Sequence, residues 1–144
     1  MKIQITDNRL TPKMMAPATE GSAGIDLYAC IDTPVRLWED EKVKVSAGIK
    51  VAIPQGWIGV IVPRSSTGFE GKWLANVIGV IDSDYRGDVI VAIKNTSNWI
   101  EVIAPMDRIA QMLVIPHYEY NNIEVTDTLD ETIRGVGSFG STGK

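Results

Sequence analysis

Four of the six arginines lie in short segments rich in Ser, Gly, Asp or Gln, and this grouping indicates phosphate chemistry. They are Arg64, Arg86, Arg108 and Arg134, whereas the eight lysines show no such bias. Arginine presents a planar fork of N–H groups that binds phosphate oxygens in a bidentate manner. Polar loops that carry these arginines therefore suggest a polyphosphate site. Each arginine taken alone fits an ordinary turn residue or an interface ion pair better.

A second polar segment carries two carboxylates and an aromatic ring directly after an apolar run. Residues 82–87 read Asp-Ser-Asp-Tyr-Arg-Gly, and residues 77–81 before them are all Val, Ile or Gly. Such a run predicts a strand, and a strand end combines rigid support with access to solvent. A plain turn is the alternative interpretation, because Asp and Gly favour turns for local hydrogen-bonding reasons.

The chain changes character from Thr126 onward. The last nineteen residues contain four glycines, and their only large apolar side chains are Leu129, Ile133, Val136 and Phe139. A segment with so little apolar surface is expected to be mobile when no ligand is bound. Glycine N–H groups can approach phosphate oxygens closely, so this segment could close over a phosphate ligand.

The elements that must position these residues are strands almost throughout. Short segments rich in Val and Ile predict strands at 25–30, 48–53, 57–62, 89–94, 99–103 and 109–115. No segment shows a sustained helical period, and at most one short helix fits near 67–74. Turn signals recur at roughly ten-residue intervals, which is typical of an all-β barrel or sandwich.

Composition narrows the classes of protein to which the chain could belong. Its 144 residues, 44% hydrophobic and 22% charged, fit one globular domain. A net charge of -4 argues against nucleic-acid binding, which needs a basic surface. No run of about 18 apolar residues predicts a membrane span. The first residues do not resemble a signal peptide, so we expect a cytoplasmic location without membrane contact.

The single cysteine, Cys30, and the single histidine, His117, argue against several kinds of site. One cysteine cannot form a disulfide within the chain, which agrees with a reducing compartment. Together the two residues leave no zinc site built from His and Cys and argue against a Ser-His triad. His117 follows Pro116 at a predicted strand end and is interpreted as a structural or surface residue.

Five segments taken together resemble the five ordered motifs of the trimeric dUTPase family. They are Ala-Gly-Ile-Asp-Leu-Tyr-Ala at 23–29, Pro-Arg-Ser-Ser at 63–66, residues 79–89, Asp-Arg-Ile-Ala-Gln at 107–111, and residues 134–143. The match spans nearly the whole chain. One such motif would be weak, but five in the right order and at suitable intervals are specific.

The resemblance implies an enzyme that hydrolyses dUTP to dUMP and pyrophosphate, which lowers dUTP and supplies dUMP for dTMP synthesis. The implied fold is all-β, a distorted jelly-roll β-barrel over residues 1–125, followed by a flexible glycine-rich arm over 126–144. Family members form homotrimers with active sites at subunit boundaries, and each site draws on three chains. The implied partners are therefore dUTP and further copies of the chain.

By the same resemblance, Asp82 is the general base that activates a water for in-line attack on the α-phosphate. Tyr85 lies against the deoxyribose and disfavours a 2′-hydroxyl. Asn76, six residues before Asp82, helps a β-hairpin to read the uracil edge. The general chemistry agrees, because hydrolysis of a phosphoanhydride needs an aligned water, a base and charge neutralisation.

The resemblance places the phosphates against the second and fourth motifs. Ser65 and Gln111 contact the phosphates, with Arg64 and Arg108 near them in phosphate binding or site support. Ser66 belongs to the same substrate-binding set.

Magnesium is the implied cofactor, and the arm supplies the remaining contacts. The ion is held through the triphosphate and waters, with Asp26 in its outer shell, which suits an ion that sheds water reluctantly. Arg134 resembles the γ-phosphate ligand and Phe139 the ring that stacks on uracil. By the same resemblance, Ser141, Thr142 and Gly143 are the donors that close the site, and Gly140 belongs to the substrate-binding set.

Three positions and one segment depart from the family pattern. Asp88 stands where the third motif usually has Glu, and Met106 replaces the usual Gly before Asp107. Ser138 replaces a tail glycine, which should stiffen the arm. The segment 69–75 is slightly shortened, so the assignment of Asn76 depends on its distance to Asp82.

Two other functions remain as alternatives. The dCTP deaminases share this fold and resemble the chain around Arg64-Ser65-Ser66, but they lack the Asp-x-Asp-Tyr-Arg-Gly and terminal Phe-Gly-Ser-Thr-Gly patterns. A regulatory binding protein derived from a dUTPase is the second alternative. Asp82, Tyr85 and the tail argue that hydrolysis is intact.

Overall fold

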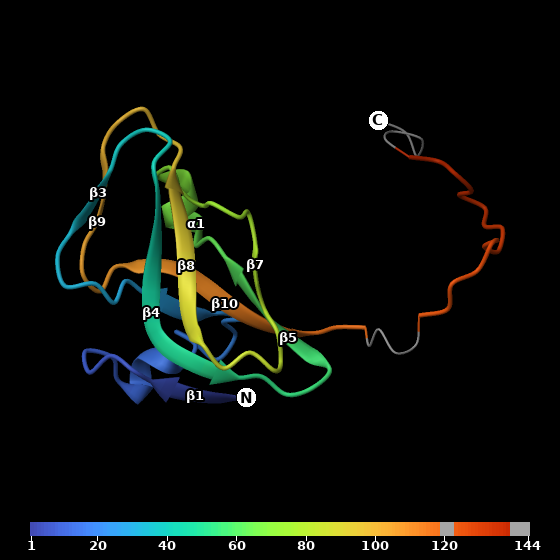
Figure 1. The fold of residues 1–144 in the computed structure, drawn as a ribbon, viewed down its shortest axis with the longest axis horizontal. Coiled ribbons are helices and arrows are strands. Elements are labelled where there is room, and N and C mark those ends of the chain that lie inside the picture. Colours follow the sequence, from blue (N-terminus) through green and yellow to red (C-terminus); the bar gives the residue numbers. More distant parts are fainter. Residues whose placement is uncertain (119–122, 139–144) are drawn as a thin grey trace.

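The computed structural model of the chain describes residues 1–118 and 123–138, and its fold is built almost entirely of strands (Figure 1). The described residues form one short α-helix, α1 (Ser65–Phe69), and one turn of 3-10 helix, η1 (Pro12–Met15). The strands are β1 (Lys2–Ile5), β2 (Ile25–Tyr28), β3 (Val35–Leu37), β4 (Lys42–Ala52), β5 (Trp57–Val62), β6 (Lys72–Leu74), β7 (Gly79–Ile81), β8 (Asp88–Asn95), β9 (Glu101–Ile103) and β10 (Arg108–Pro116).

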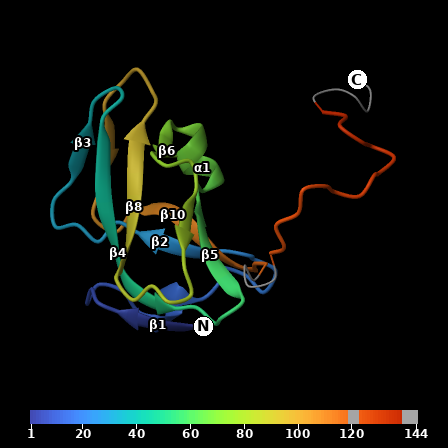
Figure 2. The ribbon, with the colours of Figure 1, turned by 45° about the vertical axis from the view of Figure 1, so that its right-hand side comes forward.

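The strands form two four-stranded sheets and one two-stranded ribbon. The first sheet has the order β1-β4-β8-β6, the second has the order β2-β10-β5-β7, and β3 pairs with β9. All these pairs are antiparallel. In Figure 1 β10 of the second sheet crosses behind the upright strands β4 and β8, and β5 and β7 lie to their right. Figure 2 shows the same arrangement in a turned view. This arrangement confirms the predicted all-β fold of jelly-roll type.

The core lies between the two sheets and consists of inward-facing residues from alternating strand positions. In β8 every second residue is buried, including Val89, Val91 and Ile93. The opposing sheet contributes Leu27 and Met112, which are also fully buried. Because successive strand residues point to opposite faces, this alternation decides which side of each strand is left for a ligand or a partner.

A bulge at Gly48 allows β4 to pair with two neighbouring strands, β8 and β1. The register with β8 shifts between Ser46 and Lys50, and Gly48 has a φ of 65° in the left-handed region. A Cβ at Gly48 would lie 2.5 Å from the Sγ of Cys30 and 2.7 Å from the Cβ of Asp7. Only glycine fits there without displacing these side chains, and the bend lets β4 pair with both β8 and β1.

The structure corrects several predicted bounds. The apolar pattern predicts a strand at 48–53, whereas β4 already begins at Lys42, because its first residues alternate Lys with Val. At most one short helix is expected near 67–74, and the one helix, α1, begins earlier and ends at Phe69, while residues 72–74 form β6. The pattern predicts neither β1 nor β3, which are only four and three residues long.

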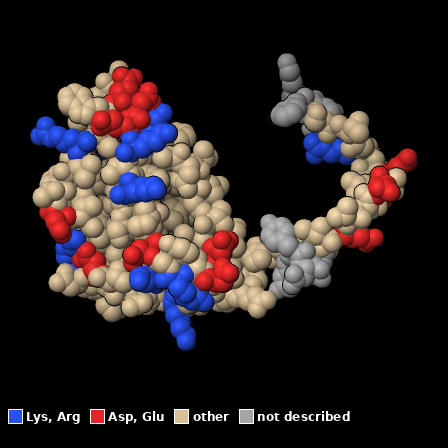
Figure 3. Space-filling model, in the orientation of Figure 1, with Lys and Arg blue, Asp and Glu red and all other residues tan. Residues whose placement is uncertain are grey.

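Charged side chains are mixed over the surface. On the face shown in Figure 3, the described acidic residues lie among Lys and Arg residues without forming one extended basic area. This distribution agrees with the net charge of -4. In the described part of the chain, no helix has the length and apolar character needed to cross a membrane.

Asn95, the last residue of β8, is fully buried and joins three segments at one end of the barrel. Its Nδ2 donates hydrogen bonds to the carbonyl oxygens of Leu37 at 2.9 Å and Trp99 at 2.7 Å. Its Oδ1 accepts hydrogen bonds from the backbone N and the Oγ of Ser97, both at 2.8 Å. The amide therefore satisfies polar groups that would otherwise be unpaired in a buried position.

Replacing Asn95 should be costly for stability. Asn95→Ala removes these bonds and should lower the free energy of unfolding by about 2 to 4 kcal/mol. Chemical denaturation at a fixed protein concentration measures the loss. Asn98→Ala, in the same loop but exposed, is the matched control and should change stability by less than about 0.5 kcal/mol. Equal stability of the two variants would contradict the structural role of Asn95.

Candidate active site

The turn after β7 presents the carboxylate of Asp82 and fixes the ring of Tyr85. The backbone N of Tyr85 donates to the carbonyl oxygen of Asp82 at 3.2 Å, and the Tyr85 hydroxyl donates to the carbonyl oxygen of Asp88 at 3.0 Å. The Nη1 of Arg86 donates to the carbonyl oxygens of Ser83 and Tyr85, both at 2.7 Å. Arg86 therefore stabilises the turn's own backbone in this structure.

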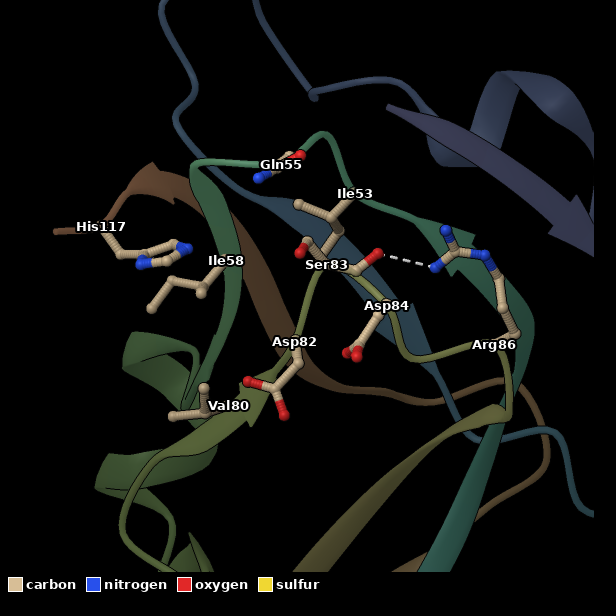
Figure 4. Close-up of a pocket in the computed structure, with 9 residues that line it drawn as sticks. All are labelled: Ile53, Gln55, Ile58, Val80, Asp82, Ser83, Asp84, Arg86 and His117. Atoms are coloured by element: carbon tan, nitrogen blue, oxygen red, sulfur yellow. Dashed lines mark hydrogen bonds between the residues drawn. The ribbon is translucent and has the colours of Figure 1, made fainter. Parts of the chain in front are cut away.

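A cavity of about 700 Å³ opens beside this turn (Figure 4). It lies between the turn, the start of β5 and the end of β10, and it combines two carboxylates with polar and aliphatic groups. Its lining residues are Ile53, Gln55, Ile58, Val80, Asp82, Ser83, Asp84, Arg86 and His117. The volume lies within the range of small-molecule sites.

A second group of predicted residues meets around Asp26 on β2. Its Oδ1 accepts a hydrogen bond from the Nε of Arg64 at 2.8 Å, and its Oδ2 lies 3.3 Å from the Nη1 of Arg108. We call Asp26, Arg64 and Arg108 the Asp26 cluster. It links three predicted motifs, because Arg64 precedes α1 and Arg108 begins β10. One carboxylate thus orients two guanidinium groups suited to phosphate binding.

Gln111 lies beside the Asp26 cluster because β10 and β2 pair in register. Gln111 is opposite Asp26, and its Nε2 donates to the carbonyl oxygen of Pro63 at 3.1 Å. A Cβ at Gly24 would lie only 2.7 Å from the Oε1 of Gln111. Gly24 in the first motif therefore leaves room for the Gln111 side chain of the fourth motif.

The start of α1 exposes two hydroxyl groups next to Arg64. Ser65 and Ser66 are exposed residues of the first turn of α1. Thr67 is buried, and its Oγ1 accepts from the backbone N of Arg64 at 3.1 Å and donates to the carbonyl oxygen of Arg64 at 3.0 Å. Thr67 thus fixes the local backbone and leaves the two serines available to a ligand.

A further cation lies near the two arginines. Lys72 lines a cavity of about 250 Å³ together with Arg64 and Arg108. Burial opposes the charge of Lys72, but the carboxylates of Glu70 at 2.9 Å and Glu101 at 3.0 Å more than offset it and raise the pKa of Lys72. Lys72 therefore keeps its positive charge, although these two carboxylates already neutralise it.

The predicted site residues fall into two groups that a single chain keeps apart. The described residues that line the cavity beside Asp82 include no member of the Asp26 cluster and not Gln111. The predicted base and the predicted phosphate-binding groups therefore line different cavities. The predicted nucleoside contacts flank the same strand, since Asn76 precedes β7 and Tyr85 follows it, and both are exposed, but neither lines the cavity beside Asp82.

The arm residues have no described contact with either group. Residues 123–138 contain no helix or strand and extend away from the barrel in both ribbon views (Figures 1 and 2). The Nε of Arg134 donates to the carbonyl oxygen of Gly137 at 3.0 Å. The remaining arm positions of the predicted site lie outside the described residues: Phe139, Gly140, Ser141, Thr142 and Gly143.

His117 lines the cavity beside Asp82, although the sequence indicates only a structural or surface role. Its neighbours in the cavity come from β5, β7 and the turn after β7, which are distant in sequence. In the sequence, the only indication of this location is the position of His117 just beyond the end of an apolar strand. That position does not show which strands lie beside His117 in the fold.

The described residues offer little inner-shell coordination for a metal. No group of three or more His, Cys, Asp or Glu side chains in residues 1–118 and 123–138 is arranged to hold an ion. Both carboxylate oxygens of Asp26 already interact with arginines. The site therefore fits magnesium only if phosphates and waters supply most of the ligands, as this ion often allows.

The whole chain is similar to proteins of one known family. A family model for dUTPase matches residues 11–143. The chain belongs to the dUTPase family. It is 38% identical over 148 residues to the deoxyuridine 5'-triphosphate nucleotidohydrolase of Escherichia phage T5, with 99% of this chain and 98% of that relative covered. The protein of the same name from Herminiimonas arsenicoxydans is 39% identical over 144 residues, with 99% and 96% covered.

Solved dUTPase structures share the fold of this family member. A mutant dUTPase of Staphylococcus bacteriophage 80alpha with dUpNHpp matches with a TM-score of 0.85 at 22% identity, over 99% of this chain and 98% of that chain. A mutant dUTPase from phage phi11 of S. aureus, described as revealing the coordination of a structural Mg(II) ion, matches with a TM-score of 0.75 at 19% identity, over 88% and 96%. These likenesses confirm the fold.

The Asp26 cluster should contribute to the stability of this dUTPase fold. Asp26→Asn removes the negative charge between two guanidinium groups and should lower the free energy of unfolding by about 1 to 2 kcal/mol. Urea denaturation at pH 7 measures the change. The matched control is Asp32→Asn, because the Asp32 carboxylate is 96% exposed and reaches Arg9 only at 3.4 Å. A loss no larger than that of the control would show that the cluster is not a structural anchor.

Proposed function

We propose that this chain is a dUTP diphosphatase that hydrolyses dUTP to dUMP and pyrophosphate, with Asp82 as general base. The observation that carries the proposal is the Asp82 carboxylate at the end of β7, opening into a cavity of about 700 Å³ in a chain matched to dUTPases over residues 11–143. Relatives that share about two fifths of the residues over the full chain bear the name of this activity.

In the proposed reaction, Asp82 accepts a proton from a water that attacks the α-phosphorus in line with the leaving group. The bond between the α-phosphorus and the bridging oxygen breaks, and the electron pair leaves with pyrophosphate. Phosphoryl transfer of this kind depends on positioning and charge neutralisation. Arg64 and Arg108 supply fixed positive charge, and the exposed hydroxyl of Ser65 can donate to a phosphate oxygen. Ser66 and Gln111 complete the proposed phosphate contacts.

Magnesium supplies further charge neutralisation in this proposal when it is bound with the triphosphate. Asp26 would hold the ion through water, since its two oxygens already orient the arginines. Tyr85 would lie against the deoxyribose, because its hydroxyl is fixed by the carbonyl oxygen of Asp88 while 42% of the residue stays exposed. Asn76 would help to read uracil at the start of the same hairpin.

The separation of the two residue groups supports a site shared between copies of the chain. The outer face of the sheet β2-β10-β5-β7 is aliphatic and open: Val60 pairs with Val80 and Leu113, and Ile58 pairs with Ile115. Val80 is 56% exposed and Ile115 is 41% exposed. An apolar face of this kind favours association.

Packing copies of the chain against this face would bring the two groups together. The face ends at Asp82 on one side, whereas Gln111 and the Asp26 cluster lie on the other. We therefore propose a homotrimer in which one copy supplies the base and another supplies the phosphate-binding groups. The arm over 126–144 of a further copy would close the site, with Arg134 on the γ-phosphate and Phe139 on uracil. Cytoplasmic location stays a prediction of the sequence.

The role of Asp82 can be tested by separating binding from chemistry. Asp82→Asn should bind dUpNHpp within about threefold of wild type and lose roughly 10²- to 10⁴-fold in kcat, because only proton transfer is removed. Asp84→Asn is the matched control on the same turn and should lose less than about tenfold. Calorimetry measures binding, and pyrophosphate release measures turnover.

Two outcomes would overturn this assignment. A kcat within about threefold of wild type for Asp82→Asn would remove Asp82 from the role of base. Release of ammonia from dCTP, in place of pyrophosphate from dUTP, would indicate a deaminase.

Shared sites predict that two inactive variants can restore activity together. Asp82→Asn chains lack the base, and chains truncated after residue 133 lack the arm. If each site takes its base and its arm from different copies, random trimers from an equal mixture should have about one quarter of the wild-type sites intact, since each requirement is met in half of the cases. Activity after joint refolding measures this fraction. No recovery, with a trimer in ultracentrifugation, would mean that base and arm come from one chain; an active monomer would exclude the shared site.

A further inference from the structure

The ring of Tyr85 is held across the turn after β7 by contacts at both ends of the residue. Its hydroxyl donates to the carbonyl oxygen of Asp88 at 3.0 Å. Its backbone N donates to the carbonyl oxygen of Asp82 at 3.2 Å, and its own carbonyl oxygen accepts from the Nη1 of Arg86 at 2.7 Å. Because the backbone and the hydroxyl are both fixed, the ring keeps a defined position while 42% of the residue stays exposed.

Gly87 leaves the room that this ring occupies. A Cβ at Gly87 would lie 2.6 Å from the Cζ and 3.0 Å from the Cε2 of Tyr85, and it would also meet the hydroxyl oxygen. Carbon atoms that are not bonded to each other do not approach so closely, since their optimal separation is about 3.5 to 4 Å. A side chain at position 87 would therefore displace the ring and strain the contact of its hydroxyl with Asp88.

The backbone at Gly87 does not itself require glycine. The described glycines with a positive φ are Gly48, Gly56, Gly71 and Gly135. Gly87 is not one of them, so alanine could adopt its backbone conformation without the strain of a left-handed residue. The three atoms nearest to the added Cβ, outside the adjoining residues, all belong to the Tyr85 side chain. The requirement for glycine at this position therefore comes from the Tyr85 ring.

We propose that Gly87 is a positioning residue that sets the sugar specificity of the site, because its missing side chain lets Tyr85 lie where a 2′-hydroxyl would otherwise fit. The proposal rests on the proposed hydrolysis of dUTP and extends it from Tyr85 to the residue that leaves room for the ring. The acceptor on Asp88 is a backbone oxygen, so this contact does not depend on the side chain at position 88. A displaced ring would admit the extra oxygen of a ribose and lower the preference for dUTP over UTP.

The ratio of kcat/KM for dUTP to kcat/KM for UTP tests the proposal. In Gly87→Ala this ratio should fall by about 5- to 50-fold, because rejection of the added hydroxyl depends on the position of the ring. A merely structural defect would lower both values together and leave the ratio unchanged. The matched control is Gly21→Ala, since a Cβ at Gly21 meets no atom within 4 Å. Its ratio should stay within about twofold of the wild-type ratio.

A double substitution tests whether Gly87 acts through Tyr85. Tyr85→Ala removes the ring and should lower the ratio at least as far as Gly87→Ala does. Adding Gly87→Ala to Tyr85→Ala should change the ratio by less than about twofold, because no ring is left to displace. An unchanged ratio in either single variant would overturn the proposal, and so would additive effects of the two substitutions.

The double variant also covers the case in which Gly87→Ala alone does not fold. Without the ring the added Cβ has no close contact, so the double variant should then recover the fold and show the lowered ratio of Tyr85→Ala. Failure to recover the fold would contradict the proposal.

Binding measurements separate this proposal from the proposed function. If wild type releases no pyrophosphate from dUTP, the proposed function fails. Calorimetry on the same variants then gives the ratio of the Kd values for dUpNHpp and its ribose counterpart, without turnover. A smaller preference for dUpNHpp in Gly87→Ala would support the role of Gly87 in sugar specificity, and the same preference as in wild type would overturn it.

Discussion

The two hydrogen-bonded contacts of Asp26 are the constraint on which the rest of the site depends. Its carboxylate holds Arg64 and Arg108, which are far apart in the sequence, and thereby ties β2, α1 and β10 together. Two guanidinium groups without an anion between them would repel each other and lose rotamer order. With Asp26 in place they are oriented before any phosphate arrives, and preorganised charge is the form of charge that stabilises a transition state best. The same arrangement leaves Asp26 few free lone pairs, which agrees with an outer-shell role toward magnesium.

In the proposed mechanism a single chain does not form a complete site, because one sheet holds the phosphate-binding groups and the base at separate places. β10 carries Arg108 and Gln111 near its start and leads to His117 beyond its end, on the side where β7 delivers Asp82. The β-sheet thus spaces the phosphate-binding groups and the base along one aliphatic face. Covering that face with another copy would bury apolar surface and complete the site in the same step. Assembly and catalysis are then two consequences of one sheet geometry.

The sequence predicts those parts of the structure in which local pattern and tertiary environment agree. β5 and β10 are rich in Val and Ile and appear within one residue of their predicted bounds. The first half of β4 alternates Lys with Val, and the three residues of β6 carry too little pattern, so neither is predicted. For the site, the motifs predict roles for Asp82 and Asp26, but no local pattern shows that the two side chains line different cavities. The position of His117 in the cavity depends on strands that are neighbours only after folding.

The exposed arm has few contacts of its own, so its closure over the proposed site would depend on contacts with the substrate. Ile133 and Val136 are fully exposed. The Nε of Arg134 donates a hydrogen bond to the carbonyl oxygen of Gly137, which belongs to the same segment. The barrel therefore contributes little stabilisation to this stretch. Ordering it costs about 1 to 2 kcal/mol per fixed residue, which only several strong contacts can offset. A γ-phosphate offers charge-assisted hydrogen bonds to Arg134, whereas dUMP has no group at that distance. Closure in the proposed mechanism thus follows the presence of the full triphosphate, and opening follows its cleavage, because the product removes the contacts that compensate the entropy.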